Sequence, residues 1–145
     1  MQDDILQQLR GTVVCRSLEE TSAVARAFLG VLGREGALAL SGDLGTGKTA
    51  FVKELAKHLG IRQTVKSPSF NVCCIYDIPD GGRLVHIDAY RFTDPSQYES
   101  LLVDEIAPEP RIVCVEWPEL AEGYFKPDYW LDFDIRGEAH TITLR

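Results

Sequence analysis

Basic residues are too scarce in this sequence for a protein that holds nucleic acid by itself. Fifteen Lys and Arg residues stand against 22 Asp and Glu residues, so the formal net charge at neutral pH is −7. Binding to nucleic acid rests on many contacts between Lys or Arg side chains and phosphate groups. We therefore expect that this acidic chain does not grip nucleic acid alone.

The sequence also lacks segments that cross or target membranes. No apolar run approaches the roughly 20 residues that a membrane-spanning helix needs. Residues 1–5 have neither the basic start nor the apolar stretch of a secretion signal. We therefore expect a cytoplasmic protein without membrane contact.

Cysteine occurs at only four positions, and none has the spacing of a metal site. Cys15, Cys73, Cys74 and Cys114 form no Cys-x-x-Cys pair. The adjacent Cys73 and Cys74 lie in an apolar, strand-like run, where alternation points the two thiols to opposite faces of a sheet. We expect all four to be buried, reduced thiols that act as small hydrophobic residues.

The most informative stretch is Ser-Gly-Asp-Leu-Gly-Thr-Gly-Lys-Thr at residues 41–49. It fits the phosphate-binding loop pattern, Gly, four residues, then Gly-Lys-Ser/Thr, at every fixed position. An apolar run precedes it and apolar residues at helical spacing follow it, so strand, loop and helix come in the required order. The residues expected to hold the nucleotide are Gly42, Asp43, Leu44, Gly45, Thr46, Gly47, Lys48, Thr49 and Ala50.

The chemistry follows from that order. The three glycines permit backbone angles that turn consecutive N–H groups inward around a phosphate chain. The start of the following helix directs its unpaired N–H groups at the same phosphates. Lys48 can reach the β and γ phosphates, and the Thr49 hydroxyl can ligate Mg²⁺.

Two carboxylates are candidates for work on the γ-phosphate. Asp88 and Glu116 each end an apolar strand, and such acids point toward the crevice beside the phosphate loop. Phosphoryl transfer needs Mg²⁺ and a residue that positions the attacking oxygen. His86 shares a strand face with Asp88, and we expect a buried, hydrogen-bonded core histidine there.

Other residues near these motifs have open roles. Lys66 with Ser67 and Ser69 can form a loop that senses the γ-phosphate. Arg91 can approach the phosphates or pair with a carboxylate. Trp117 can shield the site from water, stack on a ligand or pack as an ordinary core aromatic.

The pattern of segments predicts an α/β fold. Strands are expected at 12–16, 37–40 and 111–116, helices at 17–32, 50–59 and 94–103, a short helical segment at 119–122, and hairpins from 70–76 with 84–87 and from 129–135 with 139–144. With 145 residues, one domain spanning residues 1–145 is expected. We predict a P-loop NTPase-like domain whose central sheet is mixed, partly parallel and flanked by helices.

Four blocks of residues together resemble the TsaE (YjeE) family of bacteria. They are the loop at 42–49, Val-Lys-Ser-Pro-Ser-Phe at 65–70, His-Ile-Asp-Ala-Tyr-Arg at 86–91 with Asp-Pro at 94–95, and Val-Glu-Trp-Pro at 115–118. The blocks occur in family order and span most of the chain. The loop alone is generic, whereas the other three in succession are distinctive.

The resemblance implies an ATPase that binds ATP or ADP with Mg²⁺ and is required for the N6-threonylcarbamoyladenosine (t6A) modification of tRNA. It implies partner proteins, TsaD and TsaB, which carry the transfer chemistry and through which tRNA is held. Lys48, Glu116 and Asp88 then correspond to catalytic residues. Thr49 and Glu116 correspond to the metal site, and Thr21 to a residue near the nucleotide base.

Two other functions stay open at this point. The chain can be a nucleotide-gated module whose occupancy, rather than hydrolysis, assembles the partner complex. It can also be a small-molecule kinase, although it is short for an enzyme with a lid and an acceptor pocket. The sequence has no Asn/Thr-Lys-x-Asp element of Ras-type GTPases, which favours adenine nucleotides.

Overall fold

The computed structural model describes residues 2–68 and 71–145. Its elements are α1 (Gln2–Arg10), β1 (Val13–Cys15), α2 (Leu18–Leu32), β2 (Gly36–Ser41), α3 (Lys48–His58), β3 (Cys73–Asp77), β4 (Arg83–Asp88), the 3₁₀ helix η1 (Pro95–Leu101), α4 (Val103–Ile106), β5 (Arg111–Glu116), the 3₁₀ helix η2 (Pro118–Ala121), β6 (Tyr129–Arg136) and β7 (Ala139–Leu144). No helix of these described segments is long and apolar enough to span a membrane.

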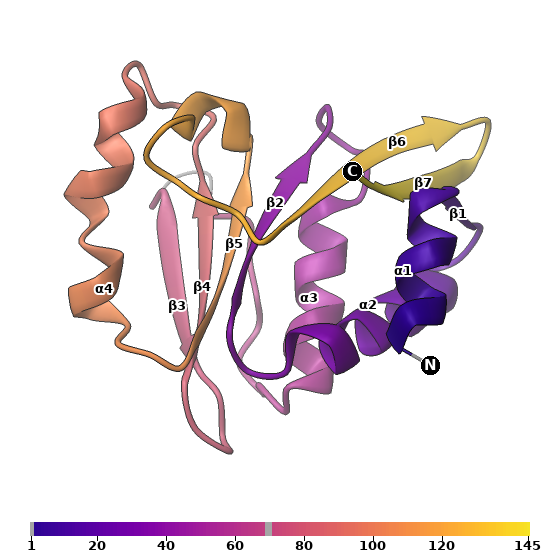
Figure 1. Cartoon of the computed structure of the whole chain (residues 1–145), viewed down its shortest axis with the longest axis horizontal. Coiled ribbons are helices and arrows are strands. Elements are labelled where there is room, and N and C mark those ends of the chain that lie inside the picture. The colour runs from indigo at the N-terminus through magenta and orange to yellow at the C-terminus, as the bar shows by residue number, and fades with distance from the viewer. Residues whose placement is uncertain (1, 69–70) are drawn as a thin grey trace.

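The strands form one mixed sheet in the order β1-β7-β6-β2-β5-β4-β3 (Figure 1). Strand β2 runs parallel to both of its neighbours, β5 and β6, and β4 runs parallel to β5. The edges are antiparallel, because β3 folds back on β4 and β7 folds back on β6 before pairing with β1. The predicted fold class, an α/β domain with a partly parallel sheet, is confirmed, as are both predicted hairpins.

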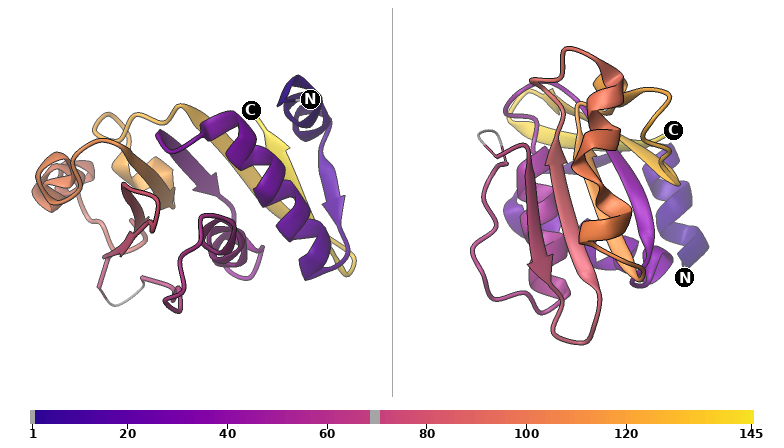
Figure 2. Two further views of the ribbon diagram at one scale, coloured as in Figure 1. Left: turned by 90° about the horizontal axis from the view of Figure 1, so that it is seen from below. Right: turned by 90° about the vertical axis from the view of Figure 1, so that its left-hand side faces the viewer.

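Helices lie on both faces of the sheet (Figure 2), and side-chain alternation along the strands divides the core between these faces. Leu38 and Leu40 of β2 pack with the helix residues Phe28 and Phe51 on the face covered by α1, α2 and α3. Ala39 belongs to the smaller core beneath η1, α4 and η2 on the other face. Alternation along β2 therefore determines which of its side chains face α3.

The cysteines are partly as predicted. All four are free, and Cys73 and Cys74 pack against opposite cores, as alternation requires. Cys15 and Cys114 are buried, but Cys73 and Cys74 are only half-buried, because β3 is an edge strand. Burial still raises the pKa of the Cys73 thiol to about 11, so this thiol stays protonated at neutral pH.

The segment after β4 differs from the predicted helix. Asp94 caps it through its contact with the Ser96 N–H at 2.8 Å, with Pro95 at the first position as predicted. The helix is nevertheless 3₁₀ and ends at Leu101, and the next residue, Leu102, has a φ of 55° that separates it from α4. No residue of η1 is fully buried, and only Tyr98 and Leu101 pack partly buried against the smaller core, so little apolar burial stabilises an α-helix there. The segment predicted at 119–122 is likewise the 3₁₀ helix η2.

The first helices also depart from prediction in detail. α1 was not predicted, although its Leu9 is fully buried. Helix α2 begins after Ser17 as predicted, with the Glu20 N–H donating to the Ser17 hydroxyl oxygen at 3.2 Å, and its C-cap is Gly33. Leu18, the first residue of α2, is 55% exposed and lies outside its buried face.

Candidate nucleotide-binding site

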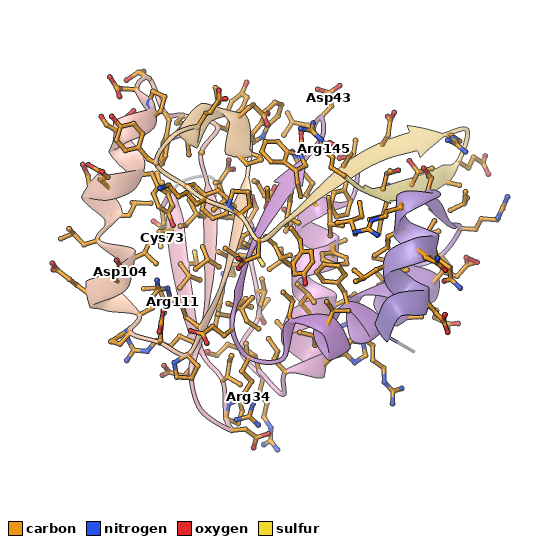
Figure 3. The ribbon with its side chains drawn as sticks, viewed as in Figure 1. Arg34, Asp43, Cys73, Asp104, Arg111 and Arg145 are labelled. Carbon is orange, nitrogen blue, oxygen red and sulfur yellow. The ribbon has the colours of Figure 1, made fainter. Side chains whose placement is uncertain are left out.

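The predicted phosphate loop joins the carboxyl end of β2 to the amino end of α3. Gly42, Gly45 and Gly47 all have positive φ, at 146°, 78° and 106°. Gly47 occupies the N-cap position of α3, where no side chain caps the helix. The first N–H groups of α3 therefore remain available to an anion. Figure 3 shows Asp43 at this end of β2, far from Arg34, which lies at the other end.

The C-terminal hairpin braces this loop. A Cβ on Gly42 would lie 2.4 Å from the Phe133 carbonyl oxygen in β6, so the loop passes directly against that strand. The His140 Nδ1 of β7 lies 2.9 Å from the Thr46 carbonyl oxygen, which accepts a hydrogen from it. Within the loop, the Thr46 hydroxyl donates to the Asp43 carbonyl oxygen at 2.7 Å. The loop is thus held in shape before any ligand arrives.

This packing predicts that Gly42→Ala destabilises the protein far more than Gly45→Ala does. Both glycines have positive φ, so each substitution brings backbone strain of about 1–2 kcal/mol. Only the Cβ at position 42 also meets backbone, and nothing lies within 4 Å of one at position 45. We expect Gly42→Ala to lower the free energy of unfolding by about 3 kcal/mol, measured by urea denaturation. Equal losses for the two variants would contradict the observed close approach.

Lys48 begins α3 with its charge turned into the site. Its side chain is only 4% exposed, and Nζ donates to the Gly42 carbonyl oxygen. Nζ also lies 4.3 Å from the centroid of the Trp117 ring, a cation–π contact. Burial lowers the pKa of Lys48, and the nearby carboxylates Glu116 and Asp88 oppose that effect only in part.

Glu116 ends β5 and is the centre of the polar network. Its Oε2 accepts from the Thr49 hydroxyl at 3.0 Å and from His86 Nε2 at 2.6 Å. His86 is buried and hydrogen-bonded as predicted, but its partner, Glu116, was not predicted. Burial raises the pKa of Glu116, but these hydrogen bonds and the charge of Lys48 outweigh it, so the net pKa lies below the ordinary value.

Asp88 lies beside Glu116 because β4 and β5 run parallel. The two residues are register partners, so their side chains emerge on the same face of the sheet. Asp88 is buried, and its Oδ1 accepts the Tyr90 N–H at 2.9 Å. The structure therefore brings both predicted carboxylates to one point, opposite the start of α3.

These groups surround a cavity of about 340 Å³. Its lining consists of Leu44, Gly45, Gly47, Lys48, Thr49, Ala50, Ser67, Asp88, Glu116, Trp117 and His140. Three other predicted loop residues, Gly42, Asp43 and Thr46, shape the loop without lining the cavity. His140 was missed, because nothing in its local sequence indicates which strand will lie beside the loop.

The remaining candidates are placed less directly. Thr21 is buried in the first turn of α2, where its hydroxyl lies 3.4 Å from the Ser17 carbonyl oxygen, and it does not line the cavity. Its place near a nucleotide base stays a prediction. Lys66 and Arg91 are exposed, while Ser67 reaches the cavity. Ser69 lies outside the described residues.

The oxygen atoms at the cavity suit Mg²⁺. Thr49 and Glu116 provide a hydroxyl and a carboxylate that already lie within 3.0 Å of each other. Mg²⁺ is commonly held by one or two such side chains together with phosphate oxygens and water. Residues 2–68 and 71–145 contain no cluster of three His, Cys, Asp or Glu side chains that could hold a metal ion without such additional ligands.

A cavity of about 390 Å³ lies at the opposite end of the sheet and has a different character. Its lining includes Gly36, at the start of β2, and Arg111, at the start of β5. Arg111 is paired with Asp104 of α4, and the two are seen side by side in Figure 3. Because its arginine is already paired with a carboxylate, this cavity offers less to an anionic ligand than the one beside Lys48.

The lowered pKa of Glu116 predicts an acid-dependent loss of stability in metal-free protein. A carboxyl whose pKa is lower in the folded than in the unfolded protein stabilises the fold fully above its unfolded-state pKa of about 4.3. That stabilisation is lost as the pH falls through the folded-state pKa. The difference in unfolding free energy between wild type and Glu116→Gln should therefore shrink below about pH 4.3. Urea denaturation from about pH 7 to pH 3 measures it, and a constant difference would contradict the pKa shift.

Comparison with known proteins gives one consistent result. The family model described as "Threonylcarbamoyl adenosine biosynthesis protein TsaE" matches residues 15–143. A "tRNA threonylcarbamoyladenosine biosynthesis protein TsaE" from Rickettsia bellii is 34% identical over 116 residues, covering 79% of each chain. The protein of that name from Bacillus subtilis is 41% identical over 105 residues, 72% of this chain and 64% of the relative.

A solved structure agrees with the sequence matches. The crystal structure of Bacillus subtilis YdiB has a TM-score of 0.66 and 30% sequence identity to this chain, over 92% of this chain and 82% of that one. The family match contains the loop, Asp88 and Glu116 together. This chain therefore belongs to the TsaE family of threonylcarbamoyl adenosine biosynthesis proteins.

Proposed function

We propose that this protein is a Mg²⁺-dependent ATPase required for t6A modification of tRNA. One observation supports it above the others: Lys48, Thr49, Asp88 and Glu116 all line one cavity at the uncapped amino end of α3. The arrangement supplies backbone donors and a lysine for the phosphates and carboxylates for the reacting end. ATP is the substrate, and ADP and phosphate are the products.

The position of each site residue suggests its role in binding and hydrolysing ATP. The loop N–H groups and Lys48 hold the β and γ phosphates, which give the buried ammonium a close anionic partner. Thr49 and Glu116 would hold Mg²⁺, which neutralises phosphate charge when bound. Asp88, whose Oδ1 accepts the Tyr90 N–H, would orient the attacking water.

The partners follow from the family and from the charge. The relatives are named for tRNA threonylcarbamoyladenosine biosynthesis. With a net charge of −7, this chain is poorly suited to hold tRNA itself. We propose that it acts in the cytoplasm with TsaD and TsaB, that those proteins hold the tRNA, and that hydrolysis is slow without them.

A second function is favoured by the mouth of the cavity. Leu44 is 77% exposed and Tyr90 is 55% exposed, and the Tyr90 ring packs on Trp117 with centroids 5.1 Å apart. A partner that contacts these side chains would detect whether nucleotide is bound. Occupancy alone, without hydrolysis, would then assemble the complex.

Phosphate release and t6A formation, measured in the same reactions, separate the two functions. The protein is assayed alone and with its TsaD–TsaB complex, with ATP or with a non-hydrolysable ATP analogue. An ATPase function predicts that the partners accelerate phosphate release and that the analogue does not sustain repeated rounds of modification. Full modification with the analogue would replace the ATPase by the assembly module, and absence of any nucleotide effect would remove both.

A further inference from the structure

We propose that His86 is the positioning residue for Glu116, holding its carboxylate in the orientation that the metal–phosphate site requires. This inference rests on the proposed nucleotide site and adds a residue to it. His86 does not line the cavity. It acts from behind, through Glu116, and contacts neither nucleotide nor metal.

The sheet places His86 within reach of Glu116. His86 pairs with Cys114 across the parallel strands β4 and β5, so Glu116 is its diagonal neighbour on the same face. The imidazole bridges that diagonal, with Nε2 2.6 Å from Glu116 Oε2. A carboxylate accepts only, so Nε2 carries the hydrogen and donates it.

Two donors from different elements converge on one carboxylate oxygen. His86 of β4 and Thr49 of α3 both donate to Oε2. Oε1 accepts no hydrogen bond from the residues the structure describes. Two bonds to Oε2 fix the rotation of the carboxylate, which leaves Oε1 for a ligand in the cavity.

Apolar packing alone does not account for a histidine here. His86 is fully buried, and its Nδ1 has no hydrogen-bond partner among residues 2–68 and 71–145. A buried polar atom without a partner costs free energy. Its neighbours on this face, Leu84 and Cys114, belong to the apolar core, where an aliphatic side chain would avoid that cost. The compensating benefit is the bond to Glu116.

Three substitutions test the role. His86→Leu fills similar space but cannot donate, whereas the amide nitrogen of His86→Gln reaches about where Nε2 lies. ADP affinity is measured by calorimetry with Mg²⁺ and with EDTA, because loss of a positioning partner lowers metal affinity about 10–100-fold. In the leucine variant, we expect the increase in ADP affinity on adding Mg²⁺ to be about tenfold or more smaller than in wild type. In the glutamine variant, this increase should stay within about threefold of wild type. If the leucine variant does not fold, His86→Asn replaces it, since its shorter amide cannot reach Glu116.

Cys114→Ala is the matched control, because it truncates the fully buried register partner of His86 without touching the carboxylate. The inference is overturned if the leucine or asparagine variant keeps the wild-type Mg²⁺ dependence of ADP affinity. It is also overturned if His86→Gln or Cys114→Ala loses as much of that dependence as His86→Leu does. Wild-type protein that binds no Mg²⁺–ADP would overturn the proposed function itself, which makes the two failures distinguishable.

Discussion

Replacing Lys48 with methionine is expected to weaken nucleotide binding about 100-fold or more while leaving the fold at least as stable. The ammonium is buried beside the loop, where phosphate oxygens would be its full-charge partners. Removing one member of a buried charge pair costs at least about 2–3 kcal/mol, and about 2.7 kcal/mol corresponds to 100-fold. Calorimetric titration with Mg²⁺–ADP measures the affinity.

The stability half of this prediction follows from the pKa of Lys48. Burial lowers that pKa, so the folded protein carries a penalty for the charged form at every pH below the folded-state value. Methionine keeps an unbranched apolar side chain of similar length and removes the penalty. Urea denaturation of the nucleotide-free proteins should therefore show no loss of unfolding free energy.

Lys53→Met is the matched control for Lys48→Met. Lys53 belongs to the same helix but is exposed and does not line the cavity. Its substitution should leave nucleotide affinity within about twofold of wild type, since exposed charges contribute little. Equal weakening by the two variants would mean that general electrostatics, rather than the loop, governs binding.

Glu116→Gln is expected to reduce ATP hydrolysis by about 10²–10³-fold, with a much smaller effect on nucleotide affinity in the absence of Mg²⁺. The amide keeps the shape of the side chain but removes the negative charge that suits Mg²⁺ and that Thr49 and His86 hold in place. Single-turnover phosphate release measures the chemical step separately from product release.

Glu119→Gln provides the comparison for this carboxylate. Glu119 lies three residues further along, in η2, and is exposed, with its Oε2 3.4 Å from the Ser41 hydroxyl. Its neutralisation changes the same charge near the same loop without entering the cavity, so hydrolysis should stay near the wild-type rate. A comparable loss in both variants would remove the special role given to Glu116.

Local sequence was sufficient to predict those parts of the site that are consecutive in the chain. The strand, loop and helix around residues 42–49 form one uninterrupted signal, and β5 was predicted with its observed bounds, Arg111–Glu116. Asp88 and Glu116 were each predicted at a strand end. Their proximity then followed from the parallel pairing of β4 with β5.

Contacts between distant segments could not be predicted in this way. His140 and Thr46 are 94 residues apart, and their hydrogen bond exists because β6 pairs with β2 and carries β7 with it. No local sequence pattern indicates which strands will be neighbours in the sheet. The bond between His86 and Glu116 depends equally on the order of β4 and β5, so the sequence predicted a buried, hydrogen-bonded histidine but not its partner.

The most direct test of the nucleotide site uses its own tryptophan. Trp117 lines the cavity with the Lys48 ammonium 4.3 Å from its ring centroid, and phosphates that draw Lys48 away would change its fluorescence. Titration with Mg²⁺–ATP should give a saturable change at one equivalent, absent in Trp117→Phe and shifted about 100-fold or more in Lys48→Met. No saturable change, or the same curve in Lys48→Met as in wild type, would contradict a nucleotide bound at this loop.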